Sequence, residues 1–161
     1  MSTKDNLAAA FAGESQANRK YLMFAEQAEK DGFKGVAKLF RATAEAETIH
    51  AFAEFRANGG VGTTADNLQP ASNVETNEFS EMYPPMIKEA EAEGDKTAAR
   101  VFHFANEAEK VHAQLYKEAL ADMAGAEDDY YLCPICGYIH KGKTEANCPI
   151  CGAKASIFKK F

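Results

Sequence analysis

An internal repeat constrains the fold of this chain more than any other feature of its sequence. Residues 25–51 align with residues 87–113 without a gap, and 11 of the 27 aligned positions are identical. Some identities are Ala or Glu, which are common in helices, but the repeat also pairs the Glu-x-x-His that starts at Glu47 with the one that starts at Glu109. A Glu and a His three residues apart share one face of a helix. The repeat therefore predicts two helical hairpins that present equivalent polar pairs.

The helix predicted over residues 95–124 shows why these pairs matter. Its apolar stripe, the face that packs against neighbouring helices, contains two ionisable residues, Glu109 and His112. An unpaired charge on such a face is costly. A single Glu-x-x-His is more often a solvated Glu beside a hydrogen-bonded His, but two copies related by a repeat favour a shared site. The stripe consists of Ala98, Phe102, Ala105, Glu109, His112, Tyr116, Ala119 and Met123.

Gly and Pro residues divide the chain into four helical stretches and a tail. The sequence predicts helices over residues 3–30, 33–58, 77–93 and 95–124. Residues 59–76 read as a long polar connection, suited to crossing one end of a bundle. We therefore expect an all-α four-helix bundle of the ferritin-like arrangement, with one long crossover, in a first domain of residues 1–127.

A di-metal centre in such a bundle needs one further Glu from each of the two remaining helices. The sequence supplies Glu14, within the apolar stripe of the first helix, and Glu78, at the start of the third. Carboxylate and imidazole ligands suit iron or manganese. The six expected ligands are Glu14, Glu47, His50, Glu78, Glu109 and His112.

Glu81 is a seventh candidate ligand. It lies one turn after Glu78 on the same helix face. Pro84 and Pro85 follow, and prolines beyond the first turn of a helix distort it, which could leave the Glu81 side chain room to move. The alternative is an exposed acidic residue that the dipole favours at a helix start.

The tail, residues 128–161, forms a second predicted domain with its own metal site. It contains two Cys-Pro-Ile-Cys-Gly knuckles, Cys133/Cys136 and Cys148/Cys151, and no cysteine lies outside them. This clustering indicates one local metal site and not a framework of disulfides. Four thiolates predict tetrahedral iron or zinc, and so small a domain would not fold stably without the metal.

Charge and hydropathy limit the expected partners. The formal net charge of −6 argues against nucleic acid or an anionic membrane surface. The chain contains no 18-residue apolar run, and its N-terminus, MSTKDN, lacks a hydrophobic signal core. We expect a soluble, cytoplasmic protein that binds neither nucleic acid nor membrane.

The combined motifs resemble the rubrerythrin family over essentially the whole chain. They are GESQANRKY at 13–21, the paired Glu-x-x-His helices, EFSEMYP at 78–84 and the CPICGY and CPICG knuckles. The resemblance implies a non-haem di-iron centre in the bundle and one iron on the cysteines of a rubredoxin-like tail. It also implies a peroxidase of oxidative stress defence, which reduces hydrogen peroxide to water. Its electrons would come from NAD(P)H through separate proteins such as a rubredoxin or a reductase.

The resemblance also implies roles for individual ligands. Glu47 and Glu109 would bridge the two irons. Glu14 would be a terminal ligand of one iron, and Glu78 and His112 would bind the other.

The first iron, by the same resemblance, would exchange Glu81 for His50 between its oxidised and reduced states. Tyr21 lies two helical turns after Glu14 on the same face, and its hydroxyl could hydrogen-bond a ligand or a bound oxygen species. Tyr83 could do the same, although each tyrosine could equally be a packing residue with a satisfied hydroxyl.

A different class of function fits the same ligands. A four-helix di-iron site could serve as a ferroxidase or iron-handling centre, with the tail acting as a zinc-bound structural or docking module. Iron or zinc on the four cysteines would distinguish the two.

The length of the fourth helix suggests how electrons would travel. Glu109 lies roughly 24 Å of helix before Gly125, at about 1.5 Å per residue, so a tail left at that end would be a slow donor to its own bundle. Residues 1–127 carry a net charge of −8 and residues 128–161 a net charge of +2, which favours docking. We expect a head-to-tail homodimer in which each tail lies against the bundle of the partner subunit.

Overall fold

The computed structural model describes residues 2–124 and 128–161. The chain divides into two compact units, Met1–Gly62 and Thr63–Phe161, and each is described by itself. No helix in the described ranges is long and apolar enough to cross a membrane.

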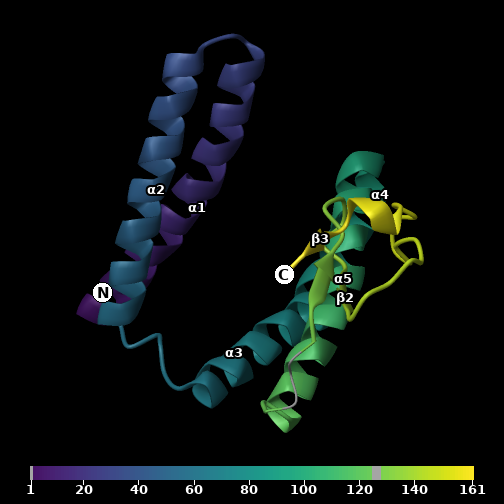
Figure 1. Ribbon diagram of the computed structural model, residues 1–161. Helices are drawn as coiled ribbons and strands as arrows, with labels where there is room; N and C mark the ends of the chain where they lie inside the picture. The colour runs from purple at the N-terminus through teal and green to yellow at the C-terminus, as the bar shows by residue number, and fades with distance from the viewer. Residues whose placement is uncertain (1, 125–127) are drawn as a thin grey trace. The chain divides into compact units, whose positions relative to one another are not determined.

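The first unit is an antiparallel hairpin of α1 (Thr3–Lys30) and α2 (Lys34–Ala57), as Figure 1 shows. Ser2 caps the start of α1, because its hydroxyl accepts a hydrogen bond from the third backbone N–H of the helix, that of Asp5. Gly32 turns the chain between the helices with φ +86°, a conformation that costs other residues energy. The two helices predicted for this region are confirmed.

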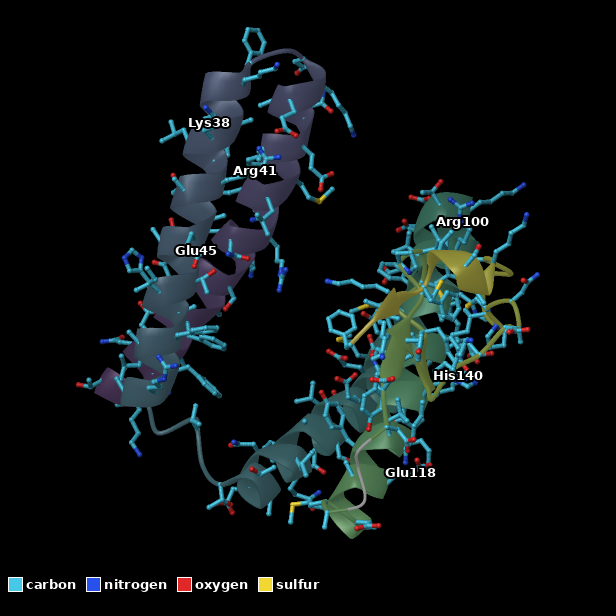
Figure 2. The ribbon with its side chains drawn as sticks, viewed as in Figure 1. Lys38, Arg41, Glu45, Arg100, Glu118 and His140 are labelled. Atoms are coloured by element: carbon cyan, nitrogen blue, oxygen red, sulfur yellow. The ribbon has the colours of Figure 1, made fainter. Side chains whose placement is uncertain are left out.

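Small side chains let α1 and α2 pack closely. The Asn18 amide donates to the carbonyl of Ala44 (2.6 Å) and to the hydroxyl of Thr48 (2.8 Å). Arg41, labelled in Figure 2, reaches from α2 to Glu29 on α1 at 2.9 Å. The buried residues of the two helices are all alanines: Ala25, Ala28, Ala37, Ala44 and Ala51.

Four helical segments make up most of the second unit. α3 and α4 both pack on α5, and Figure 1 shows α3 beside the green α5. Gly94, with φ +76°, ends α4, and the Asp95 side chain caps the start of α5. The segments are α3 (Thr64–Asn77), the π-helical η1 (Glu78–Met82), α4 (Tyr83–Glu93) and α5 (Lys96–Ala121).

The predicted connection over residues 59–76 is wrong for most of its length, because α3 lies there. The Thr63 hydroxyl accepts a hydrogen bond from the Asp66 N–H (3.2 Å), and the Asp66 carboxylate accepts one from the Thr63 N–H (3.0 Å). This reciprocal capping starts a helix. Pro70 suggested a loop, but inside α3 it removes only one helix hydrogen bond. The remaining connection is residues 58–63.

The irregular backbone predicted near Glu81 is confirmed as the π-helical η1. Pro84 and Pro85 have no N–H to continue the α-helical hydrogen bonds. The N–H of Tyr83 bonds to the carbonyl of Glu78, five residues earlier, so η1 contains one wider turn.

The tail forms a small sheet around its cysteines and is called the cysteine module below. The strands pair antiparallel in the order β2-β1-β3. Phe104 of α5 packs against the buried cysteines. The predicted fold class, a ferritin-like all-α protein with a small four-cysteine domain, is confirmed. The elements are β1 (Tyr130–Leu132), β2 (Ile139–Lys141), η2 (Ala155–Ile157) and β3 (Lys159–Lys160).

The predicted domain boundary after residue 127 remains a prediction. It adjoins residues 125–127, which lie outside the described part of the chain. The compact units divide at a different place, after Gly62, because the cysteine module contacts α5.

Candidate metal centres

The four cysteines converge as the knuckle spacing predicts. Their sulfur atoms all lie within 4.8 Å of one another, with Cys133 and Cys151 3.6 Å apart and Cys136 and Cys148 3.4 Å apart. Each knuckle closes through a glycine N–H that bonds to the carbonyl of its first cysteine. Burial raises the pKa of the Cys136 thiol. Four convergent sulfurs are a donor set for a thiophilic cation, which would replace the protons of the thiols.

The first unit holds one carboxylate–imidazole group, Glu14, Glu47 and His50, called the first triad below. Its ligand atoms lie within 4.8 Å of one another. The Nδ1 of His50 is 3.0 Å from Glu47 Oε2 and 3.7 Å from Glu14 Oε2. The structure therefore brings together three of the predicted ligands, from both helices of the hairpin.

Glu14 and Glu47 interact directly within the first triad. Their hydrogen bond raises the pKa of Glu14 and lowers the pKa of Glu47. A cation bound between them would favour the ionised form of both carboxyls.

The second unit holds an equivalent group, Glu75, Glu109 and His112, called the second triad below. Its ligand atoms also lie within 4.8 Å of one another. The Nδ1 of His112 is 2.6 Å from Glu109 Oε2 and 3.6 Å from Glu75 Oε2. Glu109 and His112 are therefore together, as predicted, but the other carboxylate is Glu75.

The carboxyls of the second triad have unequal pKa values. Burial, followed by the hydrogen bond with Glu109, raises the pKa of Glu75 to about 7. Burial opposes ionisation of Glu109 too, but hydrogen bonds with His112 and Glu75 outweigh it and lower its pKa. For His112, burial favours the neutral ring, yet the bond to Glu109 raises the pKa overall.

Sequence reasoning missed Glu75 because it placed that residue in a loop. The Thr63 and Asp66 capping pair was the signal that could have started the helix earlier. Glu75 and Glu78 then lie one turn apart, and Glu78 is half-buried, with a pKa raised first by burial and then by the charge of Glu109. Glu81 is exposed on η1, and the structure does not bring it into either triad.

A hydrogen bond joins the second triad to the cysteine module. His112 Nε2 lies 2.9 Å from the carbonyl oxygen of Gly137, the residue after Cys136. Because a carbonyl only accepts, Nε2 carries the proton, and Nδ1 is left as the ligand atom. The roughly 24 Å of helix after Glu109 therefore does not separate the cysteine module from this triad, since the module lies along its own α5.

The predicted tyrosines lie outside both triads. Tyr21 packs against Phe24 and Phe40, with ring centroids 6.3 and 6.1 Å away. Tyr83 packs against Phe102 at 6.3 Å, and burial raises its pKa. Neither contact tests a role toward a bound oxygen species.

The donor sets fit the expected metals. Each triad offers two carboxylates and one imidazole, the donor types with which a di-iron carboxylate site binds its metals. The four thiols form a separate set suited to a single iron or zinc ion.

Family comparisons agree with both donor sets. The rubrerythrin model matches residues 5–120, and the model of the rubredoxin-like domain of rubrerythrins matches residues 131–159. Nigerythrin from Nitratidesulfovibrio vulgaris is 44% identical over 175 aligned positions, which cover 99% of this chain and 87% of the relative. The alignment is longer than the 161 residues of this chain, so nigerythrin contains residues without a counterpart here.

Other relatives give the same result. Rubrerythrin-2 from Clostridium acetobutylicum is 38% identical, with 99% of this chain and 96% of the relative covered. Rubrerythrin from Porphyromonas gingivalis is 34% identical, with 98% and 88% covered. A structure of fully reduced, all-ferrous nigerythrin superimposes with a TM-score of 0.61 at 40% identity and covers all of this chain and 87% of that one. Together with the two triads and the four convergent cysteines, these matches show that the chain belongs to the rubrerythrin family.

Proposed function

We propose that this protein is a non-haem di-iron peroxidase that reduces hydrogen peroxide to water in oxidative stress defence. Its family establishes an oxidoreductase with a di-iron carboxylate/His site and a rubredoxin-like iron site. Peroxide as the substrate, and NAD(P)H as the electron source through a rubredoxin or a reductase, are parts of the proposal.

One contact carries the proposal, the hydrogen bond between His112 and Gly137. It links a ligand of the helical site to the backbone beside Cys136, a ligand of the cysteine site. A protein that accepts electrons at the cysteines and uses them at the carboxylates needs such a short link. A zinc-bound docking module does not need one, so this contact favours the peroxidase over the ferroxidase alternative.

The residues around the helical site would bind the metals and hold protons. When bound, two ferrous ions supply the two electrons and the Lewis acidity that cleavage of an O–O bond requires. Glu47 and Glu109 would hold the metals as shared ligands, since each already bonds both to the His and to the other carboxylate of its triad. Glu75, whose pKa is raised to about 7, would release its proton when metal binds.

We further propose that each metal-binding carboxylate of the third helical region lies three residues, about one helical turn, before the residue that the sequence suggested for its role. Glu75 takes the terminal position expected of Glu78, because it is the carboxylate beside His112. Glu78 takes the place expected of Glu81 as the seventh, mobile carboxylate. It begins the π-helical η1, and its pKa is raised by burial and by the charge of Glu109. His50, with a side chain 58% exposed, is free enough to exchange with it.

The proposal is tested by separating the two halves of the reaction. Anaerobically purified, iron-loaded protein is reduced chemically and mixed with peroxide, and its reoxidation is followed by absorption. NAD(P)H consumption is then measured with a reductase and a rubredoxin present. We expect fast reoxidation by peroxide in the first assay and peroxide-dependent NAD(P)H consumption in the second.

The double variant Cys133→Ser/Cys136→Ser is the matched control. It removes the cysteine-bound iron but leaves both triads, so it should keep reoxidation by peroxide and lose NAD(P)H-driven turnover. If oxygen reoxidises the reduced protein faster than peroxide does, and the cysteines hold zinc, the protein is instead a ferroxidase.

Three expectations remain with this proposal. A homodimer is retained as a prediction, although the tail contacts α5 of its own chain and the helix-length argument for a head-to-tail arrangement no longer holds. A cytoplasmic location and a role for Tyr21 near bound peroxide are also retained as predictions, and Tyr21→Phe should slow reoxidation by peroxide without loss of iron.

A further inference from the structure

The connection between α2 and α3 is short for the bundle in which it must lie. α2 ends at Ala57 and α3 begins at Thr64. In the ferritin-like arrangement the second and third helices run in the same direction, which is why a long crossover joins them. Here only residues 58–63 are available for that crossover.

The reach of this connection can be compared with the distance it must cover. Along α2, Ala57 lies about 15 Å beyond Glu47, and along α3, Glu75 lies about 16 Å beyond Thr64, at about 1.5 Å per residue. If both carboxylates belong to one metal centre on parallel helices, the chain must travel back about 31 Å between Ala57 and Thr64.

Even fully extended, the connection is too short for that path. Ala57 to Thr64 spans about 24 Å at most, at about 3.4 Å per residue. The true reach is less, because the N–H groups of Gly59 and Gly60 bond back to the carbonyls of Arg56 and Phe55. One chain therefore cannot supply both triads to a single centre in this arrangement.

The first unit also needs a partner for its apolar face. All buried residues of α1 and α2 are alanines, whereas Val36 and Leu39, which lie three turns before Glu47 and His50 on the same face of α2, are 46% and 65% exposed. Because the burial of such side chains is the main source of stability, a hairpin that leaves them in water lacks most of its core.

We propose that each di-iron centre is assembled from two copies of this chain. The first triad of one copy joins the second triad of the other, and the same exchange in reverse builds a second centre. The occupant of each apolar hairpin face is thus the α3–α5 face of a second copy, in a closed two-fold dimer. The inference rests on the proposed di-iron site and explains why the short connection is tolerated.

Mixed dimers test this assembly by counting iron. A chain with Glu47→Gln/His50→Gln and a chain with Glu109→Gln/His112→Gln are co-expressed with different affinity tags. Double-tagged dimers are isolated by two successive purifications. In an exchanged dimer one centre combines both damaged triads, and the other combines both intact triads.

We expect each mixed dimer to hold about two irons beyond those on its cysteines, with the visible absorption of an intact di-iron centre. Each variant alone should hold none beyond the cysteine iron, which serves as the internal standard for folded protein. If every chain closes its own bundle, the mixed dimer also has no intact centre, and that result would overturn the proposal. Failure to recover any double-tagged dimer, when wild-type chains with the same tags give one, would overturn it as well.

A longer connection provides an independent test that leaves every ligand in place. Inserting about 14 Gly and Ser residues after Gly60 adds up to about 48 Å of reach, enough for one chain to close its own bundle. We expect the wild type to be a dimer with full iron and the lengthened chain to populate a monomer with full iron. A wild-type monomer that already binds two irons in its helices would refute the exchange. Both tests count iron, so they remain decisive even if the protein fails to reduce peroxide.

Discussion

The two triads come from repeated sequences, yet the fold places them in different surroundings. In the first triad the His50 side chain is 58% exposed, and its Nδ1 contacts both carboxylates. In the second triad the His112 side chain is 17% exposed, and its far nitrogen is held by Gly137. Similar ligands therefore give one open and adjustable position and one fixed position.

This difference suggests a division of labour at the proposed di-iron site. An exposed His on one side can leave its metal and be replaced by a carboxylate. A buried His fixed by a backbone carbonyl keeps its tautomer and its orientation. The cysteine module contacts the fixed His, so we expect electrons to enter at that side of the proposed site.

Replacing each histidine in turn should give the largest difference in iron affinity between the two triads. His112→Gln should reduce iron affinity by about 10-fold or more, because both a ligand and its backbone anchor are lost. His50→Gln should cost less, because it removes a ligand but leaves the contact between His112 and the cysteine module in place. Iron per chain, measured anaerobically against the cysteine iron, checks this order, and equal losses would show that the two positions are equivalent.

Replacing the three acidic residues of the third helix should give a graded series. Glu75→Gln should lose metal, because it removes a neighbour of His112. Glu78→Gln should keep iron but slow the peroxide cycle, and Glu81→Gln should change neither. Parallel measurements of iron content and turnover decide this. If Glu81→Gln gave the slow cycle with full iron, the mobile carboxylate would be Glu81, as the family resemblance implied.

The two triads should also differ in their effect on the pH dependence of stability in metal-free protein. Glu75 has a folded pKa of about 7 against a usual value near 4.5, so the folded state binds its proton more tightly than the unfolded state. Its stabilising contribution is complete below pH 4.5 and is lost as the pH rises through 7. The raised pKa of His112 acts in the same direction.

We therefore expect the thermal midpoint of chelator-treated protein to fall between about pH 5 and pH 8. Glu75→Gln should flatten this slope markedly, and Glu14→Gln, which alters the more exposed triad, should flatten it less. A Glu75→Gln protein with the wild-type slope would argue against a protonated Glu75.

The smallest expected effects come from the two helix caps. Thr63→Ala and Ser2→Ala each remove one side-chain cap and should cost about 1 kcal/mol of stability. Only Thr63→Ala should also weaken iron binding slightly, because it frays the helix that carries Glu75. Denaturant unfolding and iron titration of both variants make the test, and equal iron affinities would mean that α3 does not depend on this cap.

The sequence alone determined the features that depend on local spacing. The two Cys-Pro-Ile-Cys-Gly knuckles specify a four-thiol site because each turn presents its own pair of sulfurs. The Glu-x-x-His pairs specify ligands on one helix face because three residues make nearly one helical turn. The hairpin of α1 and α2 followed from Gly32 and the flanking apolar stripes for the same reason.

Only the tertiary structure decided which distant groups meet these local ones. Glu75 became a candidate ligand because α3 begins at Thr63 and packs on α5, and a polar segment containing Pro70 does not reveal that by composition. The contact between Gly137 and His112 required the chain to fold back along α5, which helix length could not indicate. Local geometry is set by neighbouring residues, whereas these contacts depend on packing between segments far apart in the chain.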